Sequence, residues 1–271
     1  MKLSLKSVCL NLGGVLMVVT ALLGGGTLAL AQDKPAAAAT AAPAKDFKDE
    51  RALKLLKGMS DKLAGAKSLS FQFRGLVPTT APTGQFINLM ASSRVVMQRP
   101  DKLYVQARGD LFPSDLYYNG KTVTAIGVGQ KFYAQRDAAG GLIEAFMKGA
   151  QPGGAAVAPF MDLLVSDPYA VLTRDLSSAL WVGQSTVGGV KADHLAFASP
   201  GVDWEIWIGA QDQLPRLMVV SHRKLEREPT FTVELSDWKV NASVPASTFN
   251  AVIPKGAVKI EFKPNSPAPA K

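Results

Sequence analysis

The chain has one cysteine and two histidines in 271 residues, and this shortage excludes several kinds of chemistry. Cys9 is the only cysteine, and no small residue precedes it to favour a lipid-modified terminus. Once the N-terminal segment is removed, the chain has no thiol and can form no disulfide or cysteine-based metal site. His194 and His222 lack nearby cysteines or suitably spaced glutamates, so they make a poor metal site. We therefore expect no metal and no cofactor.

Acidic residues are also few. The chain has 30 Lys and Arg against 22 Asp and Glu, a net charge of +8. Loss of Lys2 and Lys6 with the N-terminal segment lowers this charge to +6. The positive excess is spread along the chain, which favours contact with anionic surfaces such as lipid headgroups. It forms no stripe with interleaved aromatic residues, so we expect no nucleic-acid partner.

Long apolar runs are limited to the N-terminus. Two lysines precede the apolar stretch Val8–Leu23, and the small residues of Ala29–Ala31 follow it. A membrane-spanning helix needs about 20 apolar residues, whereas this run is shorter and is broken by Gly24–Gly26. We therefore predict a secretory signal peptide over residues 1–31, cleaved after Ala31, and a periplasmic protein.

The remaining chain reads as a single domain between two low-complexity segments. Residues 32–45 form an Ala/Pro-rich linker, and a similar tail covers residues 264–271. We expect both to be disordered. Residues 46–263 are long enough to bury a substantial core, contain no internal repeat and are expected to form a monomer.

The first half of this domain changes from a helical to a strand period. Residues 46–66 repeat apolar side chains at spacings of three and four, which predicts a helix. Residues 69–73, 94–98 and 103–108 then alternate apolar and polar side chains, which predicts strands. Asn119-Gly120 is a strong tight-turn signal. We expect a meander of five or six strands.

The middle of the chain has a different pattern, with short helices expected at 141–147, 160–165 and 167–172. Asp167 is placed to cap the last of these, and Pro168 occupies its first position. Strands resume at 180–186, 190–197, 202–208, 217–222 and 231–238. The predicted class is mainly β (α+β), a curved antiparallel sheet with an N-terminal helix and a helical insertion at about residues 140–173.

Apolar side chains gather on one face of the predicted strands and on the insertion. Those of the strands are Phe71, Phe73, Val95, Met97, Leu103, Val105, Trp204, Ile206 and Ile208. Those of the insertion include Phe146, Met147, Phe160, Met161, Leu163 and Leu164. Both an ordinary core and a hydrophobic ligand pocket require such a pattern, and periodicity alone favours the core.

Catalytic arrangements receive little support. Asp193-His194 and Ser221-His222 contain the residue types of a hydrolase triad. No serine lies in a nucleophile elbow, however, and adjacent strand residues point to opposite faces. Asp203 and Glu205 share a strand face, as on the solvated side of a half-buried strand. We expect no catalytic residues and no enzyme activity.

The order of several segments resembles the periplasmic lipoprotein carrier LolA and its relatives LolB and RseB. These segments are Leu63–Ala66, Leu69–Phe73, Gln98–Leu103, Tyr118–Val123, Ala158–Leu164, Val244–Asn250 and Ile253–Ala257. His194–Phe197 followed by Val202–Ile208 is more similar to an uncharacterised family of predicted periplasmic proteins with that fold.

The resemblance implies an incomplete β-barrel whose apolar concave face is covered by a helical lid. It also implies that Arg99, which precedes Pro100, latches the lid by bonding to its backbone. A guanidinium carries several donors in a fixed fork, and helix ends offer unpaired carbonyls. A solvent-facing turn arginine is the alternative reading of Arg99.

The favoured hypothesis is a periplasmic binding or carrier protein. It would hold lipid or lipoprotein acyl chains between the concave sheet and the lid, with an inner- or outer-membrane protein as a further partner. A second hypothesis is an envelope-stress sensor like RseB. A non-binding structural domain is a third, and a hydrolase is the least favoured.

Overall fold

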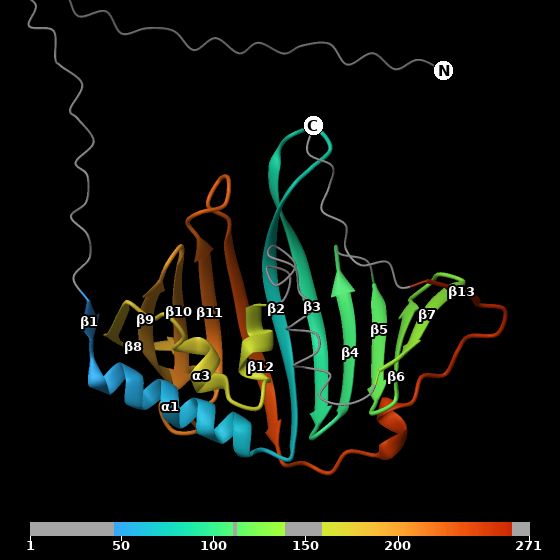
Figure 1. The fold of residues 1–271 in the computed structure, drawn as a ribbon, viewed down its shortest axis with the longest axis horizontal. Coiled ribbons are helices and arrows are strands. Elements are labelled where there is room, and N and C mark those ends of the chain that lie inside the picture. Colours follow the sequence, from blue (N-terminus) through green and yellow to red (C-terminus); the bar gives the residue numbers. More distant parts are fainter. Residues whose placement is uncertain (1–45, 111–112, 139–158, 262–271) are drawn as a thin grey trace, which may run out of the picture. The chain divides into compact units, whose positions relative to one another are not determined.

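The computed structural model describes residues 46–110, 113–138 and 159–261, which form a single large sheet with one long and two short helices on one face (Figure 1). The expected signal peptide, the linker, the tail and the short helix at 141–147 lie outside these residues. Among the described residues, no helix is both long enough and apolar enough to span a membrane.

The first helix, α1, spans Glu50–Gly65 within the predicted range. Asp49 caps it, because its carboxylate accepts a hydrogen bond of 2.8 Å from the Arg51 amide and so satisfies one of the unpaired N–H groups of the first turn. Leu56, Met59 and Leu63 recur at helical spacing and are fully buried. This apolar side of α1 packs against the sheet.

The sheet contains thirteen described strands in the order β1-β8-β9-β10-β11-β12-β2-β3-β4-β5-β6-β7-β13. Neighbouring strands are antiparallel except at the two edges, where β1 pairs with β8 and β13 with β7 in parallel. The strands are β1 Phe47–Lys48, β2 Ser68–Thr80, β3 Phe86–Gln98, β4 Lys102–Gly109, β5 Ser114–Asn119, β6 Thr122–Gly127, β7 Phe132–Asp137, β8 Ser178–Val187, β9 Val190–Ser199, β10 Val202–Gly209, β11 Pro215–His222, β12 Thr230–Val240 and β13 Val258–Ile260. Because β1 and β13 do not pair with each other, the sheet is open. The predicted mainly-β class with an unclosed antiparallel sheet is confirmed.

The centre of the sheet joins the two halves of the chain. β12 pairs with β2, with Leu235 opposite Phe73 and Ser236 opposite Gln72. The register then shifts before Lys239, which lies opposite Ser70. Asp237 in this bulge has φ = 53°, and the extra residues let the Trp238 ring stack on Phe71 with 4.3 Å between ring centroids. The bulge thus bends β12 beside Phe71.

The tight turn between β5 and β6 follows the Asn-Gly signal. Gly120 has φ = 91°, a region that glycine enters without steric cost. The side chain of Asn119 accepts hydrogen bonds from the amides of Lys121 and Thr122 at 3.0 and 2.9 Å. These bonds fix the register of the β5–β6 pair.

Two short helices lie over the sheet in the middle of the chain (Figure 1). The helix α3 spans Pro168–Leu172 with Asp167 as its cap, as predicted, and the Ala170 amide donates to the Asp167 carboxylate at 3.0 Å. The segment expected to be helical at 160–165 is a 3₁₀ helix, η2, over Pro159–Leu163. We call η2 and α3 together the lid elements.

Several elements go beyond the sequence prediction. β2 and β3 are thirteen residues each, much longer than the alternation at 69–73 and 94–98 indicates. The edge strands β1 and β13 and the 3₁₀ helix η3 at Ala246–Phe249 have no periodic signal because they are only two to four residues long.

Candidate functional site

Arg99 lies in the turn between β3 and β4 and connects three parts of the chain. Its Nη2 donates to the main-chain carbonyls of Leu63 at 3.3 Å, Leu164 at 3.2 Å and Val165 at 3.1 Å. The first carbonyl belongs to the last turn of α1, and the other two directly follow η2. Since the last carbonyls of a helix have no partner within it, a side chain that donates to both ends ties α1 and η2 to the β3–β4 turn. The Arg99–Pro100 peptide bond is cis.

The lid elements rest on aromatic side chains of β2. The Phe160 ring of η2 lies 4.3 Å from the Phe73 ring and 6.0 Å from the Phe71 ring, in an edge-on arrangement with the latter. Phe71 also stacks on Trp238 of β12. The lid elements are therefore held by aromatic contacts near the start of η2 and by the Arg99 bonds between η2 and α3.

The predicted apolar residues form one continuous layer. Eleven of them are buried and belong to one hydrophobic cluster with α1: Phe71, Phe73, Val95, Met97, Leu103, Trp204, Ile206, Ile208, Phe160, Leu163 and Leu164. Val105 and Met161 are half-buried and pack against this cluster. Phe146 and Met147 lie outside the described residues.

The layer is unevenly covered by the described helices. On the side of the apolar layer, α1 contacts β8 and β10, and η2 contacts β12; Figure 1 shows α1 and the lid elements in front of that half of the sheet. The helix η3 contacts β4 and β5 from the other face, where Phe249 lies beside Tyr117 and Thr124. On the other half, Val105 of β4 and Leu116 of β5 lie opposite each other in the register and are half-buried. An apolar surface therefore continues past the described helices onto β4 and β5.

Asp162 of η2 is an unusual member of the lid. Its Oδ1 is buried and has no hydrogen-bond partner among the described residues. Burial raises the pKa of this carboxyl above its ordinary value, and the nearby Arg174 partly opposes the shift. Sequence reasoning did not single out Asp162, because the sequence does not reveal that its carboxylate is removed from water.

The two histidines lie on β9 and β11 and serve different contacts. His194 Nε2 lies 2.7 Å from Glu205 Oε2, and its ring stacks on Trp207 at 3.9 Å. Asp193 points to the opposite face, where it accepts hydrogen bonds from Trp181 Nε1 at 3.0 Å and Gln184 Nε2 at 3.1 Å. Asp193 therefore does not orient His194 as a triad requires.

The remaining candidates for acid, base or nucleophile are also engaged in local contacts. Ser221 Oγ lies 2.9 Å from Thr230 Oγ1, and Asp203 forms an ion pair with Arg223. The burial of His222 lowers its pKa, and its ring meets Phe231 edge-on at 5.6 Å. Within the described part of the chain, no group of three or more His, Cys, Asp or Glu could hold a metal ion.

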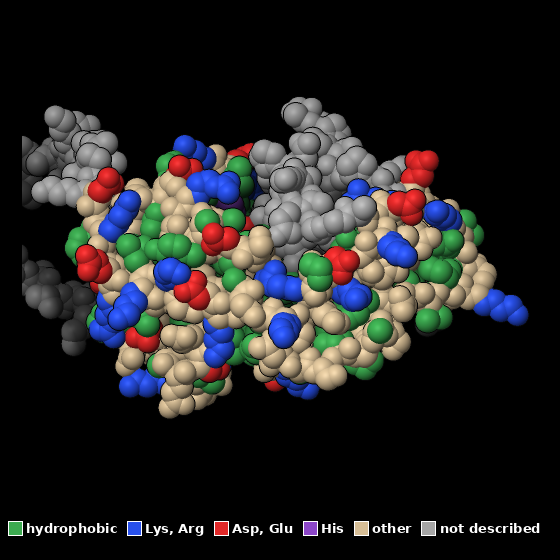
Figure 2. Space-filling model, turned by 60° about the horizontal axis from the view of Figure 1, so that its bottom comes forward, with side chains coloured by type: hydrophobic (Ala, Val, Ile, Leu, Met, Phe, Trp, Pro, Cys, Tyr) green, Lys and Arg blue, Asp and Glu red, His purple; other side chains and the backbone are tan. Residues whose placement is uncertain are grey.

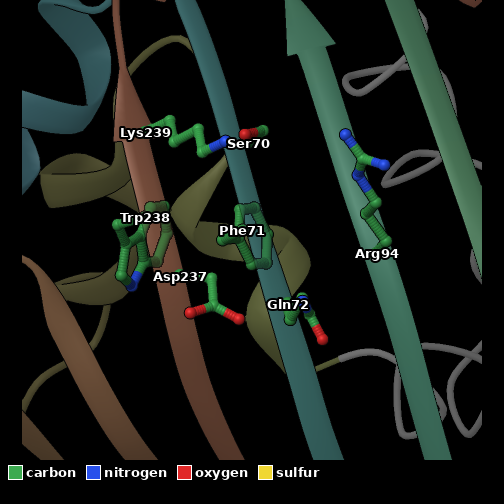
Figure 3. Close-up of a pocket in the computed structure, with 7 residues that line it drawn as sticks. All are labelled: Ser70, Phe71, Gln72, Arg94, Asp237, Trp238 and Lys239. Atoms are coloured by element: carbon green, nitrogen blue, oxygen red, sulfur yellow. The ribbon is translucent and has the colours of Figure 1, made fainter.

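A depression of about 450 Å³ opens beside the β12 bulge, lined by Ser70, Phe71, Gln72, Arg94, Asp237, Trp238 and Lys239. Figure 3 shows Arg94 on β3 and Lys239 on β12 at the two sides of β2. Gln72 and Arg94 lie opposite each other in the register, so they point to the face away from Phe71 and the lid. The hollow therefore lies on the polar side of β2, and Phe71 and Trp238 contribute to its lining from the apolar side.

The molecular face in Figure 2 carries scattered lysine and arginine side chains among acidic and apolar ones. On this face they do not merge into one basic stripe. The scattered charges on this face agree with the even distribution of lysine and arginine along the sequence.

The comparisons with known proteins identify one matching family. Residues 52–263 match the family model described as "Predicted periplasmic protein (DUF2092)". This match confirms the predicted resemblance to an uncharacterised family of predicted periplasmic proteins. The comparison with curated proteins found no match.

Solved structures with a similar fold include proteins from three bacterial genera. LprF from Mycobacterium bovis matches with 14% identity, a TM-score of 0.44 and coverage of 78% of this chain and 99% of that one. The Pseudomonas aeruginosa MucA/MucB complex matches with 15% identity, a TM-score of 0.40 and coverage of 74% of this chain and 61% of that one. A LolA superfamily protein from Nitrosomonas europaea matches with 10% identity, a TM-score of 0.34 and coverage of 74% and 97%.

Proposed function

We propose, from the premise that the chain belongs to the DUF2092 family of predicted periplasmic proteins, that it is a periplasmic binding module for a hydrophobic ligand. The ligand class is the acyl chains of a lipid or lipoprotein. They would be held against the apolar layer of the sheet, under the lid elements, and released when the lid closes onto that layer.

The Arg99 contacts are the observation that carries this proposal. A filled core needs no polar side chain to hold its cover in place, whereas here one guanidinium spans the ends of α1 and η2. Few-atom contacts of this kind can break and re-form without unfolding the strands. They therefore suit a cover that moves between two positions.

The half-buried part of the layer supports this position for the ligand. Val105 and Leu116 add apolar surface beyond the described helices, and burying such surface against an acyl chain contributes roughly 25 cal/mol per Å². Met161 borders the same layer from the lid. Its flexible thioether side chain can adapt to ligands of different shape.

The decisive experiment is a native mass spectrum of protein recovered from cells, searched for co-bound lipid. We expect an adduct whose fragments are acyl chains. A spectrum with apoprotein alone, together with no uptake of a fluorescent acyl-chain probe, would contradict the proposal.

A matched pair of variants locates the binding surface. Leu116→Gln places an amide on the face of the sheet that carries the apolar layer, and Leu217→Gln makes the same change at a half-buried position of β11 on the opposite face. We expect Leu116→Gln to weaken binding of the probe by about tenfold and Leu217→Gln to leave it within a few-fold. Equal effects of the two changes would place the ligand elsewhere.

A further inference from the structure

The β2–β3 hairpin extends beyond both of its neighbours. Pairing with β12 ends at Leu76, and pairing with β4 ends at Ala91. Among the described strands, Val77–Thr80 and Phe86–Met90 therefore pair only with each other. Figure 1 shows this two-stranded ribbon rising above the rest of the sheet.

The ribbon has the composition of a surface that meets a non-aqueous partner. Residues 75–93 contain no ionisable side chain. Leu76, Phe86, Ile87 and Met90 are between 36% and 45% exposed. A two-stranded ribbon is only marginally stable by itself in water, and contiguous exposed apolar residues on it mark an interaction site.

Both faces of the ribbon are apolar. Leu76, Met90 and Phe86 share one face, because Leu76 lies opposite Met90 and Phe86 opposite Thr80. Val77, Leu89 and Ile87 share the other by the same register. A protein partner docking on a sheet normally uses one face, whereas a ribbon that enters a bilayer interface is surrounded on both.

The ribbon edges are unsuited to adding a strand. Pro78 has no N–H to donate along β2. On β3, the Met90 amide and carbonyl are already bonded to Asp110, at 2.9 Å through its carboxylate and 2.8 Å through its amide. Pairing with an extended peptide is thus blocked at these positions, while the faces stay open.

A neighbouring turn places cations beside the apolar tip. The Arg227 guanidinium lies 5.7 Å from the centre of the Phe86 ring, and its Nη1 donates to the Gly84 carbonyl at 3.4 Å. Lys224 is exposed in the same turn, as is the apolar Leu225 at 45%. The same turn also holds Glu228 and Glu226, the latter 3.9 Å from Arg227 Nε, so residues 223–228 carry three cations against two acidic residues. Apolar residues bordered by this excess of positive charge match the hydrocarbon and anionic headgroups of a phospholipid surface.

We infer that the ribbon tip is a membrane-docking surface whose partner is an anionic phospholipid bilayer. Phe86 and Ile87 enter the interface, and Lys224 and Arg227 meet the headgroups. Val77 shares its face of β2 with Phe73 and packs against the apolar layer, so this face of the ribbon is continuous with the layer. This surface and its test do not depend on the proposed ligand site, although a docked ribbon would give that site a route to the membrane.

Vesicle binding tests the inference with matched variants. The probe is a vesicle of phosphatidylethanolamine and phosphatidylglycerol, compared with one of phosphatidylcholine alone. We expect Phe86→Ser/Ile87→Ser to weaken binding by at least about tenfold. Leu180→Ser/Val182→Ser alters two strand positions of β8 with comparable exposure, 42% and 49%, and should leave binding unchanged. Lys224→Glu should reduce the preference for the anionic vesicle.

A second measurement detects insertion directly and does not depend on a loss of function. Phe86→Trp places a fluorophore at the tip, and lipids with brominated chains should quench its added emission. Absence of quenching, or wild-type binding by Phe86→Ser/Ile87→Ser, would overturn the inference. Binding only to native membranes, abolished when their proteins are digested, would overturn it in favour of a protein partner.

Discussion

The guanidinium of Arg99 donates a hydrogen bond to the main-chain carbonyl of Val165 at 3.1 Å, across 66 positions of sequence. The same Nη2 reaches Leu63 at the end of α1. One side chain from the β3–β4 turn thus connects the segment between η2 and α3 with the last turn of α1.

Arg99→Leu tests whether these bonds latch the lid. The change removes charge-assisted hydrogen bonds worth roughly 1.5–3 kcal/mol and leaves the strands intact. Hydrogen exchange across residues 159–172 should accelerate more than across 190–238, and bound ligand should be retained longer because the closed state that expels it is weakened. Arg99→Lys should behave like Arg99→Leu, since an ammonium lacks the planar fork.

Arg94→Leu is the matched control, because Arg94 is an exposed arginine of β3 on the face away from the lid. It should alter neither exchange nor retention. Uniform exchange in both regions of Arg99→Leu would make Arg99 a structural turn residue and remove the latch.

Phe160→Ala tests the aromatic anchor of the lid. Truncation leaves a cavity between Phe71 and Phe73 and should lower the free energy of unfolding by about 3–5 kcal/mol, measured by denaturant titration. Phe132→Ala removes a half-buried ring next to the sheet edge and should cost clearly less. Equal losses would mean that Phe160 contributes no more than an edge residue.

Asp162 should make the lid pH-sensitive. A folded-state pKa above the ordinary value means that folding disfavours the charged form, so this contribution to stability is present below about pH 3.8 and is lost as pH rises through the folded pKa. Asp162→Asn should therefore raise the free energy of unfolding at neutral pH, with a smaller gain near pH 4. Denaturant titrations at several pH values measure this, with the exposed Asp137→Asn as control. A gain that is independent of pH would contradict the assignment to ionisation.

The histidines give a test of the non-catalytic assignment. His194 contacts Glu205 and Trp207, and His222 lies beside Phe231. None of these contacts pairs a histidine with a nucleophilic side chain. His194→Gln and His222→Gln should each leave binding of an acyl-chain probe within a few-fold. A hydrolytic rate on a model ester that either change abolishes would restore the enzyme hypothesis.

The N-terminal segment gives a test of export. The mature protein should begin at or very near Gln32, as determined by N-terminal sequencing of protein recovered from the cell envelope. An intact Met1, or a lipid attached to Cys9, would contradict the predicted signal peptide.

The sequence predicts well where periodicity is strict. The residues of α1 and the alternating segments of β9 and β10 bury their apolar sides as expected, because the helical and strand periods each place such residues on one side of the element. The long ribbon of β2 and β3 was not predicted. Pro78, Pro82 and Gly84 are local loop signals. The outer parts of β2 and β3 form because the two strands pair with each other, and their sequence shows no regular alternation of apolar and polar residues.

The site is predictable only in part for a similar reason. Apolar alternation identifies the members of the layer but does not show which of them stay half-buried. The carbonyl partners of Arg99 lie 36 to 66 positions away, and any residue has a carbonyl, so no side-chain pattern marks them. Only the resemblance to the LolA family indicated that Arg99 could bond to lid backbone.

The pairing of β2 with β12 at the centre of the sheet has a consequence for how the protein folds. These strands are separated by about 160 positions of sequence, and such long-range contacts slow folding. Until β12 has been synthesised and has paired, β2 has an unpaired edge at what becomes the centre of the sheet. Incomplete chains would therefore be prone to aggregation, and the two halves of the sheet must be acquired as one cooperative unit.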